Sequence, residues 1–211
     1  MTKRGRFITL EGGEGAGKST LLAGLRDYLL RQGIELLQVR EPGGTPLGEA
    51  IRSIVLDPAH PHICAESELL LMFAARAQLV RERILPALES GHWVLCDRYV
   101  DASYAYQGAG RGQPQERIAQ LEAWACAGLK PDLTLLLDLP VATGRKRAAG
   151  RGAADRIETE ADAFFERVRQ AYRDLADAEP QRWRVIDASL PAEDVLGAAT
   201  AALAHVLKVH A

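Results

Sequence analysis

The chain contains little cysteine and little charge of either sign in excess. Three cysteines are spread over 211 residues, and no two of them form a CxxC pair. Such spacing argues against a zinc site and against a disulfide framework. Lysine and arginine number 26 and aspartate and glutamate 28, which gives a formal net charge of −2. A nucleic-acid-binding surface requires a basic field, so we expect no nucleic acid partner.

Long apolar runs are also missing. No run approaches the roughly 20 residues that a membrane-spanning helix needs, and no apolar segment of signal length follows the N-terminal "MTKRGRF". The five histidines show no metal-ligand spacing, and the guanine-reading pattern N-K-x-D is absent. We therefore expect a cytoplasmic protein with reduced thiols and no membrane partner.

A glycine-rich segment, "GGEGAGKST", follows the first apolar run. Gly12, Gly17, Lys18 and Ser19 match the P-loop pattern G-x-x-x-x-G-K-[ST]. Glycine lets the backbone approach a phosphate closely, and successive amides can line an anion site. Lys18 can reach the β- and γ-phosphates, and Ser19 can hold Mg²⁺. A glycine-rich turn is the alternative. The ATP-binding candidates are Gly12, Gly13, Glu14, Gly15, Ala16, Gly17, Lys18, Ser19 and Thr20.

Short apolar runs alternate with amphipathic stretches along the chain, which predicts a parallel α/β sheet covered by helices on both faces. At 211 residues, a single domain, 1–211, is expected. The predicted strands are "RFITLE", "ELLQVR", "HWVLCD", "DLTLLLDL" and "RWRVID". The predicted helices cover 18–32, 46–56, 67–90, 115–128, 141–149, 159–178 and 192–208.

Charged pairs stand where two of these strands end, and ligands bind at that edge of open α/β sheets. Asp97 and Arg98 follow one strand; the carboxylate can hold Mg²⁺ and the guanidinium can bind a phosphate. Arg40 and Glu41 follow another strand, before a Pro-Gly-Gly turn, and Arg52 lies beyond that turn. Asp138 is a rival carboxylate without an adjacent cation. Structural ion pairs and a capped loop are the alternatives.

Two further segments carry groups that could recognise a planar base. Met72 and Phe73 lie on the same helical face as Arg76, although core packing is the favoured reading of that stripe. Ser103, Tyr104, Tyr106 and Gln107 could read the edge of a base, or could belong to a polar loop.

The segment 144–156 is rich in alanine, glycine and arginine, and we interpret it as a mobile loop. Phosphoryl transfer needs cations around the transferred group. The P-loop contains Glu14 and no arginine, so this loop could supply them. Its cations are Arg145, Lys146, Arg147, Arg151 and Arg156; a solvated face is the alternative.

Together these motifs resemble bacterial thymidylate kinases. "LEGGEGAGKST", "REPGGTPLGE", "LLMFAARAQ", "CDRYVDASYAYQGAGRG" and "DRIE" occur in the order found in that family. The resemblance implies a three-layer P-loop kinase fold with a five-stranded parallel sheet and an arginine-rich lid over about 144–158. It also implies transfer of the γ-phosphoryl of ATP to dTMP, Mg²⁺ as cofactor, and a homodimer.

The same resemblance implies roles for individual residues. Arg40 and Arg98 would hold the acceptor phosphate, Tyr106 would stand where a ribose 2′-hydroxyl would be, and Met72 or Phe73 would cover the base. The implied catalytic residues are Lys18, Arg98, Asp97, Arg147 and Arg151, and the implied metal ligands are Ser19, Asp97 and Glu41. The implied dTMP-binding residues are Glu14, Arg40, Glu41, Arg52, Met72, Phe73, Arg76, Arg98, Ser103, Tyr106 and Gln107.

Two other functions remain open at this point. A deoxynucleoside kinase would phosphorylate a neutral 5′-hydroxyl, and would need a carboxylate base and fewer acceptor-side arginines than Arg40, Arg52 and Arg98. A nucleotide-dependent switch ATPase would not need a cluster of base-reading groups after Asp97.

Overall fold

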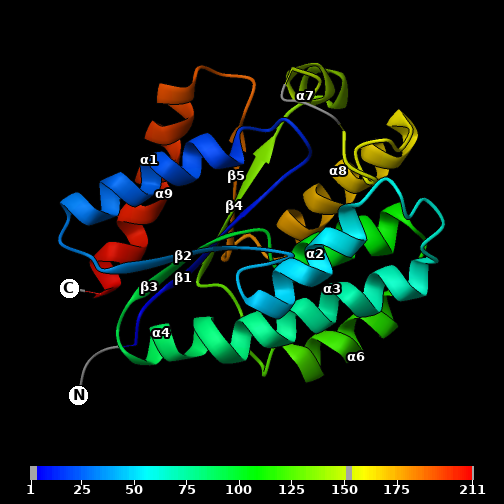
Figure 1. The fold of residues 1–211 in the computed structure, drawn as a ribbon. Helices are drawn as coiled ribbons and strands as arrows, with labels where there is room; N and C mark the ends of the chain where they lie inside the picture. The colour runs from blue at the N-terminus through cyan, green and yellow to red at the C-terminus, as the bar shows by residue number, and fades with distance from the viewer. Residues whose placement is uncertain (1–3, 151–153, 211) are drawn as a thin grey trace.

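A sheet of five parallel strands forms the centre of the protein (Figure 1). The structure is a computed structural model that describes residues 4–150 and 154–210. The strand order is β2-β3-β1-β4-β5. The strands are β1 (Phe7–Glu11), β2 (Leu36–Arg40), β3 (Trp93–Asp97), β4 (Leu133–Asp138) and β5 (Trp183–Asp187). All five predicted strands are confirmed, each with its polar end at the same edge of the sheet.

The register brings the ends of three strands together. Asp97 of β3 pairs with Leu10 of β1 on one side and with Arg40 of β2 on the other. The residues that follow these strands therefore meet at one edge of the sheet, and they include the glycine-rich segment after β1. This is the edge at which open α/β sheets bind ligands.

Helices cover both faces of the sheet, as predicted (Figure 1). α1 (Lys18–Arg31) and α9 (Ala192–His210) pack on one face through Leu25, Leu29 and Leu203. The opposite face is covered by α3 (Ala65–Leu79), η1 (Val80–Ile84), α4 (Leu85–Glu89), α6 (Gln115–Ala125) and α8 (Asp162–Ala178). The result is the three-layer α/β arrangement expected from the sequence.

Two short helices lie near the carboxyl edge of the sheet; in Figure 1, α7 is at the top and α2 lies beside α3. α2 (Pro46–Leu56) packs on α3, and the hydroxyl of Thr45 caps it by accepting a hydrogen bond from the Gly48 amide. α7 (Val141–Ala148) follows β4. The predicted mobile loop thus begins inside a helix, and residues 151–153 lie outside the described part of the chain. Within the described ranges, no helix is both long and apolar enough to cross a membrane.

The segment after β3 is helical, although a polar loop was one of the two interpretations that the sequence allowed for it. It consists of α5 (Val100–Ser103) and the π-helical turn η2 (Tyr104–Gly110). Gly110 in this segment packs directly against Phe164 of α8, where a larger residue would not fit: a Cβ on Gly110 would lie 2.5 Å from the Phe164 ring. Close contact with α8 therefore stabilises a helix that local propensity does not favour.

Candidate active site

The P-loop motif joins the end of β1 to the start of α1 and folds around its own lysine. Gly12, Gly15 and Gly17 have φ angles of 136°, 71° and 91°, in the region that favours glycine. The Lys18 Nζ donates hydrogen bonds of 3.0 Å to the carbonyl oxygens of Gly12 and Gly13. The motif predicted from spacing therefore has the geometry of a phosphate-binding loop.

The ammonium group of Lys18 lies in a desolvated position, because the side chain is buried. Burial lowers the pKa of Lys18, and the nearby charge of Arg98 lowers it further. Glu14 and Asp97 oppose this shift. Charges interact more strongly where water is excluded, so this cation is well placed to stabilise a bound phosphate.

A cleft opens against the P-loop at the carboxyl edge of the sheet, the edge at which open α/β sheets bind ligands. It brings together fourteen of the residues predicted from the sequence. These are Glu14, Gly15, Ala16, Gly17, Lys18, Ser19, Arg40, Glu41, Arg52, Met72, Asp97, Arg98, Tyr106 and Gln107. Five others line it that the sequence did not single out: Pro42, Leu56, Ala102, Asp155 and Ile157.

Arg98 reaches from β3 to the P-loop. Its φ is 69°, a left-handed conformation that costs a non-glycine residue about 1–3 kcal/mol. Its Nη2 donates a 2.6 Å hydrogen bond to Glu14 Oε1, and its Nη1 donates to Gly12 O at 2.9 Å. The guanidinium carbon lies 4.8 Å from the centre of the Tyr106 ring. These contacts fix the cation at the cleft.

Two more arginines line the cleft, Arg40 from the end of β2 and Arg52 from α2. Arg52 Nη1 donates to the carbonyl oxygen of Pro42 at 2.9 Å, and Arg40 Nη2 donates to Glu49 Oε2 at 2.9 Å. Burial lowers the pKa of Arg52, and the charge of Arg40 adds to this effect. With Arg98, the cleft gathers three guanidinium groups at the sheet edge, an arrangement suited to an anionic ligand.

Two carboxylates at the same edge have a buried oxygen without a hydrogen-bond partner among the described residues. These oxygens are Asp97 Oδ1 and Glu41 Oε1. Burial raises the pKa of Glu41, and Arg76 partly offsets this by pairing with Oε2 at 2.7 Å. Both residues line the cleft together with Ser19. Oxygen donors of this kind are the ligands that Mg²⁺ prefers.

The structure separates Met72 from Phe73, which the sequence could not do. Met72 lines the cleft, whereas Phe73 is buried in the core beneath Arg76, whose guanidinium carbon lies 4.6 Å from the ring centre. Arg76 does not line the cleft either. It donates to Glu41, to Ser103 Oγ at 3.0 Å and to the backbone. Phe73, Arg76 and Ser103 thus form a layer behind the cleft wall.

Tyr106 and Gln107 reach the cleft from η2. The Tyr106 hydroxyl donates a 3.0 Å hydrogen bond to Glu14 Oε1, which also accepts from Arg98. The Gln107 Nε2 donates to the buried Glu68 Oε1 at 2.9 Å. Glu14 of the P-loop therefore holds the side chains of Arg98 and Tyr106 in place at the cleft.

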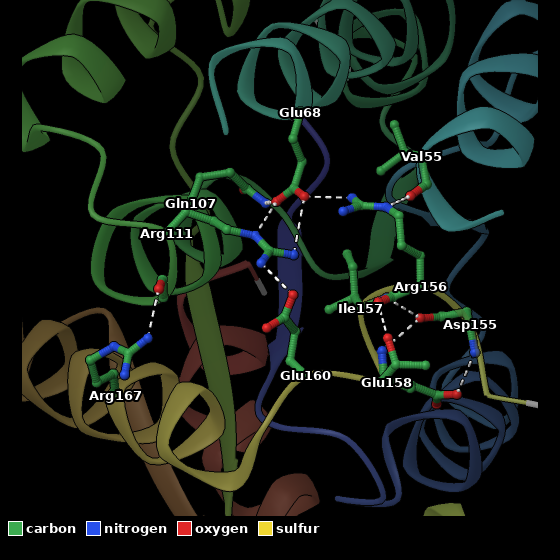
Figure 2. A network of polar contacts seen from close by, with 12 residues as sticks. Val55, Glu68, Gln107, Arg111, Asp155, Arg156, Ile157, Glu158, Glu160 and Arg167 are labelled. Carbon is green, nitrogen blue, oxygen red and sulfur yellow. Dashed lines mark hydrogen bonds and ion pairs between the residues drawn. The ribbon is translucent and has the colours of Figure 1, made fainter. Parts of the chain in front are cut away.

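Of the predicted lid cations, none that the structure describes lines the cleft. Arg147 Nη1 donates to the Ala188 carbonyl oxygen at 2.7 Å, and Arg145 Nη1 donates to the Glu160 carbonyl oxygen at 2.7 Å. Arg151 lies outside the described residues. Arg156 is buried, where the sequence favoured a loop cation. It donates to Val55 O and Glu68, because that buried carboxylate compensates its charge (Figure 2).

Asp138, the rival carboxylate, is engaged elsewhere. It accepts hydrogen bonds from Arg169 at 2.7 and 3.0 Å and from Arg173 at 3.2 Å. It does not line the cleft described above. Asp97, which has the adjacent cation Arg98, is the strand-end aspartate that lines the cleft.

Comparisons with known proteins give a consistent result. A sequence model described as thymidylate kinase matches residues 10–198. The thymidylate kinase of Alkalilimnicola ehrlichii is 60% identical over 202 residues, covering 95% of this chain and 93% of the relative. That of Pseudomonas savastanoi is 53% identical over 205 residues, covering 97% and 98%. That of Halorhodospira halophila is 51% identical over 211 residues, covering 99% and 98%.

The chain belongs to the thymidylate kinase family. The resemblance inferred from the motifs is thus confirmed. The match to the thymidylate kinase model covers the P-loop, both strand-end pairs and η2, so every element that lines the cleft lies inside it.

Some residues of this thymidylate kinase site could have been found from the sequence. Asp155 and Ile157 lie in the "DRIE" motif, which is one of the segments that resemble the family, but only Arg156 of this motif was singled out from the sequence, as a loop cation. Glu11, the last residue of β1, does not line the cleft but is buried directly before the P-loop, where it accepts hydrogen bonds from the Tyr99 amide and the Tyr172 hydroxyl, both at 2.7 Å. The sequence signal for Glu11 was a charged residue at the end of the apolar strand β1, directly before the P-loop.

Proposed function

We propose that this protein transfers the γ-phosphoryl group of ATP to dTMP and releases dTDP and ADP. Membership of the thymidylate kinase family supports this function. The observation that carries it in the structure is one cleft lined both by the P-loop and by Arg40, Arg52 and Arg98. A phosphate donor and a charged phosphate acceptor can therefore meet within it.

The three arginines favour a monophosphate acceptor over the neutral hydroxyl of a nucleoside. Arg98 and Arg40 bind the acceptor phosphate, and Arg52 lies beside them. Lys18 and the P-loop amides bind the donor phosphates. The acceptor phosphate is already largely ionised near neutral pH, so the protein supplies position and charge, and needs no strong general base.

The residues present fit a magnesium ion. Ser19, Asp97 and Glu41 line the cleft, and each carboxylate has an oxygen without a hydrogen bond among the described residues. The described residues hold no group of three or more His, Cys, Asp or Glu side chains placed for a metal. Kinase sites bind Mg²⁺ through one or two carboxylates plus substrate phosphates, so two carboxylates suffice. The bound ion would neutralise charge on the phosphates.

Gln107, Met72 and Tyr106 select the nucleotide. Gln107 reads the N–H edge of thymine, Met72 covers the base, and Tyr106 excludes a 2′-hydroxyl. A site built for one hydrogen-bond pattern rejects the opposite pattern by as much as about 10⁴, whereas loss of one methyl group costs roughly 10–200-fold. The segment of about residues 144–158 acts as a lid with Arg147 and Arg151 as its cations, and Arg147 must leave its hydrogen bond to the Ala188 carbonyl oxygen to reach the cleft. The active species is a homodimer.

The test is kcat/KM for dTMP, dUMP, dCMP and UMP with ATP in excess. The expected order is dTMP first, dUMP second, and dCMP and UMP far behind. Equal rates for dCMP or UMP and dTMP would refute the thymidylate assignment, even if all were phosphorylated. Activity with thymidine and none with dTMP would favour the deoxynucleoside kinase.

A further inference from the structure

Gln107 lies between the cleft and a buried acid. It lines the cleft, and its Nε2 donates a 2.9 Å hydrogen bond to Glu68 Oε1 on α3 (Figure 2). Its other polar atom, Oε1, is buried and has no hydrogen-bond partner among the described residues. An unpaired buried carbonyl costs free energy unless a ligand satisfies it.

Glu68 accepts hydrogen bonds and has no proton to donate in this position. The side chain is 1% exposed, and two cations pair with it: Arg156 through Oε2, and Arg111 through both oxygens (Figure 2). Burial alone would raise the pKa of Glu68. The hydrogen bonds from Gln107 and Arg156 and the charges of both arginines outweigh burial and lower that pKa instead. The group is therefore an ionised carboxylate at neutral pH.

This carboxylate decides which way the Gln107 amide points. An amide has a donor end and an acceptor end of nearly equal size, so shape alone does not orient it. An ionised carboxylate attracts the NH₂ end and repels the carbonyl end. Glu68 therefore leaves the carbonyl oxygen as the free end of the amide.

We infer that Glu68 is a positioning residue for base selection: it holds the Gln107 amide so that Oε1 accepts a hydrogen bond from N3–H of the pyrimidine. This inference rests on the proposed function, and it assigns the selectivity to a residue outside the cleft. Thymine and uracil carry a proton on N3. Cytosine carries a lone pair there, which faces the fixed carbonyl oxygen without a proton between them.

The substitution Glu68→Gln tests this inference. The amide that it introduces offers both a donor and an acceptor to Gln107, so the Gln107 amide can turn over. If the two orientations are equally populated, the competent fraction for dTMP is halved, and kcat/KM for dTMP falls only about twofold from this cause. dCMP gains an NH₂ donor for N3. We expect the ratio of kcat/KM for dTMP to that for dCMP to fall at least about tenfold.

The ratio is measured with both nucleotides on one enzyme preparation, so a lower folded fraction cancels. Glu160→Gln is the matched control. It removes the other carboxylate that pairs with Arg111 but leaves the contact between Glu68 and Gln107 in place. This variant should retain the parental ratio.

Two further variants guard against a purely structural effect. Glu68→Gln removes the negative charge that compensates the buried Arg156 guanidinium, which could prevent folding. The pair Arg156→Met and Arg156→Met/Glu68→Gln avoids that unpaired charge. The first should keep the parental ratio and the second should lose it. In a Gln107→Ala background, Glu68→Gln should leave the ratio unchanged, because the group through which it acts is gone.

The outcomes separate the two proposals. If the parental protein does not phosphorylate dTMP, the proposed function fails. If the parental protein prefers dTMP and the Glu68 variants keep the same ratio, the role of Glu68 is refuted while the function stands. A ratio that changes equally with and without Gln107 also refutes it.

Discussion

Gly144→Ala should disturb the P-loop from a helix that lies outside the nucleotide cleft. Gly144 belongs to α7, where alanine would normally stabilise the helix by about 1 kcal/mol. Here a Cβ would lie 2.3 Å from the carbonyl oxygen of Glu14. Ordinary C···O contacts are about 3.3–3.6 Å, so the P-loop and α7 must separate by roughly 1 Å. Displacement of that size at a reacting centre costs up to about 10² in rate.

Gly197→Ala is the matched control, because Gly197 is an exposed glycine of α9 whose Cβ would meet nothing within 4 Å. Overpacking costs about 1–3 kcal/mol, and each kcal/mol shifts Tm by about 2–4 °C at this chain length. Gly144→Ala should therefore melt roughly 2–12 °C below Gly197→Ala. The kcat/KM of Gly144→Ala for ATP should fall by up to about 10²-fold, while the control keeps parental activity. Equal Tm values together with parental activity for Gly144→Ala would refute the contact.

Three further substitutions test separate parts of the site. Lys18→Met should lower the rate of phosphoryl transfer by about 10²–10³ with an unchanged Tm, because one preorganised cation is lost; near-parental turnover would contradict the donor assignment. Met72→Ala should raise KM for dTMP with kcat nearly unchanged in steady-state assays, since a side chain that covers the base contributes equally before and during reaction. Burial, aided by the charge of Asp101, raises the pKa of Glu11 from 4.5 to about 8. The protonated form is therefore favoured in the folded state, and its stabilisation is lost as pH rises from about 4.5 to 8. Glu11→Gln should gain stability relative to the parent across that range in urea unfolding; a pH-independent difference would disprove it.

The sheet could be predicted from the sequence because its strands are short apolar runs that end in charged or polar residues. The run "WVLCD" is buried from Trp93 to Cys96 and presents Asp97 at the edge. Local patterns of this kind depend only on neighbouring residues. The P-loop could be predicted for the same reason, since its function resides in one contiguous segment.

The parts that failed depend on contacts between distant residues. Arg156 belongs to a run of cations that we interpret from the sequence as part of a mobile loop, yet Glu68, 88 positions earlier, compensates its charge in the interior. Phe73 and Met72 are adjacent, and helical periodicity does not decide which of them faces the ligand. The position of Arg76, fixed by Glu41 35 positions away, keeps Phe73 in the core. The residues next to Arg156 and Arg76 in the sequence give no indication of these distant partners, Glu68 and Glu41.

The central position of β1 has a consequence for the order in which the protein can form during synthesis. β1 is translated first, yet both of its neighbours in the sheet, β3 and β4, come much later in the chain. The Tyr99 amide that binds Glu11 is 88 residues away, and the Tyr172 hydroxyl is 161 residues away. At about 5–20 residues per second, the ribosome delivers these partners roughly 4–18 s and 8–32 s after Glu11. The phosphate-binding loop is thus made early. The strand that carries it, β1, has both of its neighbours in the sheet only after β4 has been synthesised, at residue 138.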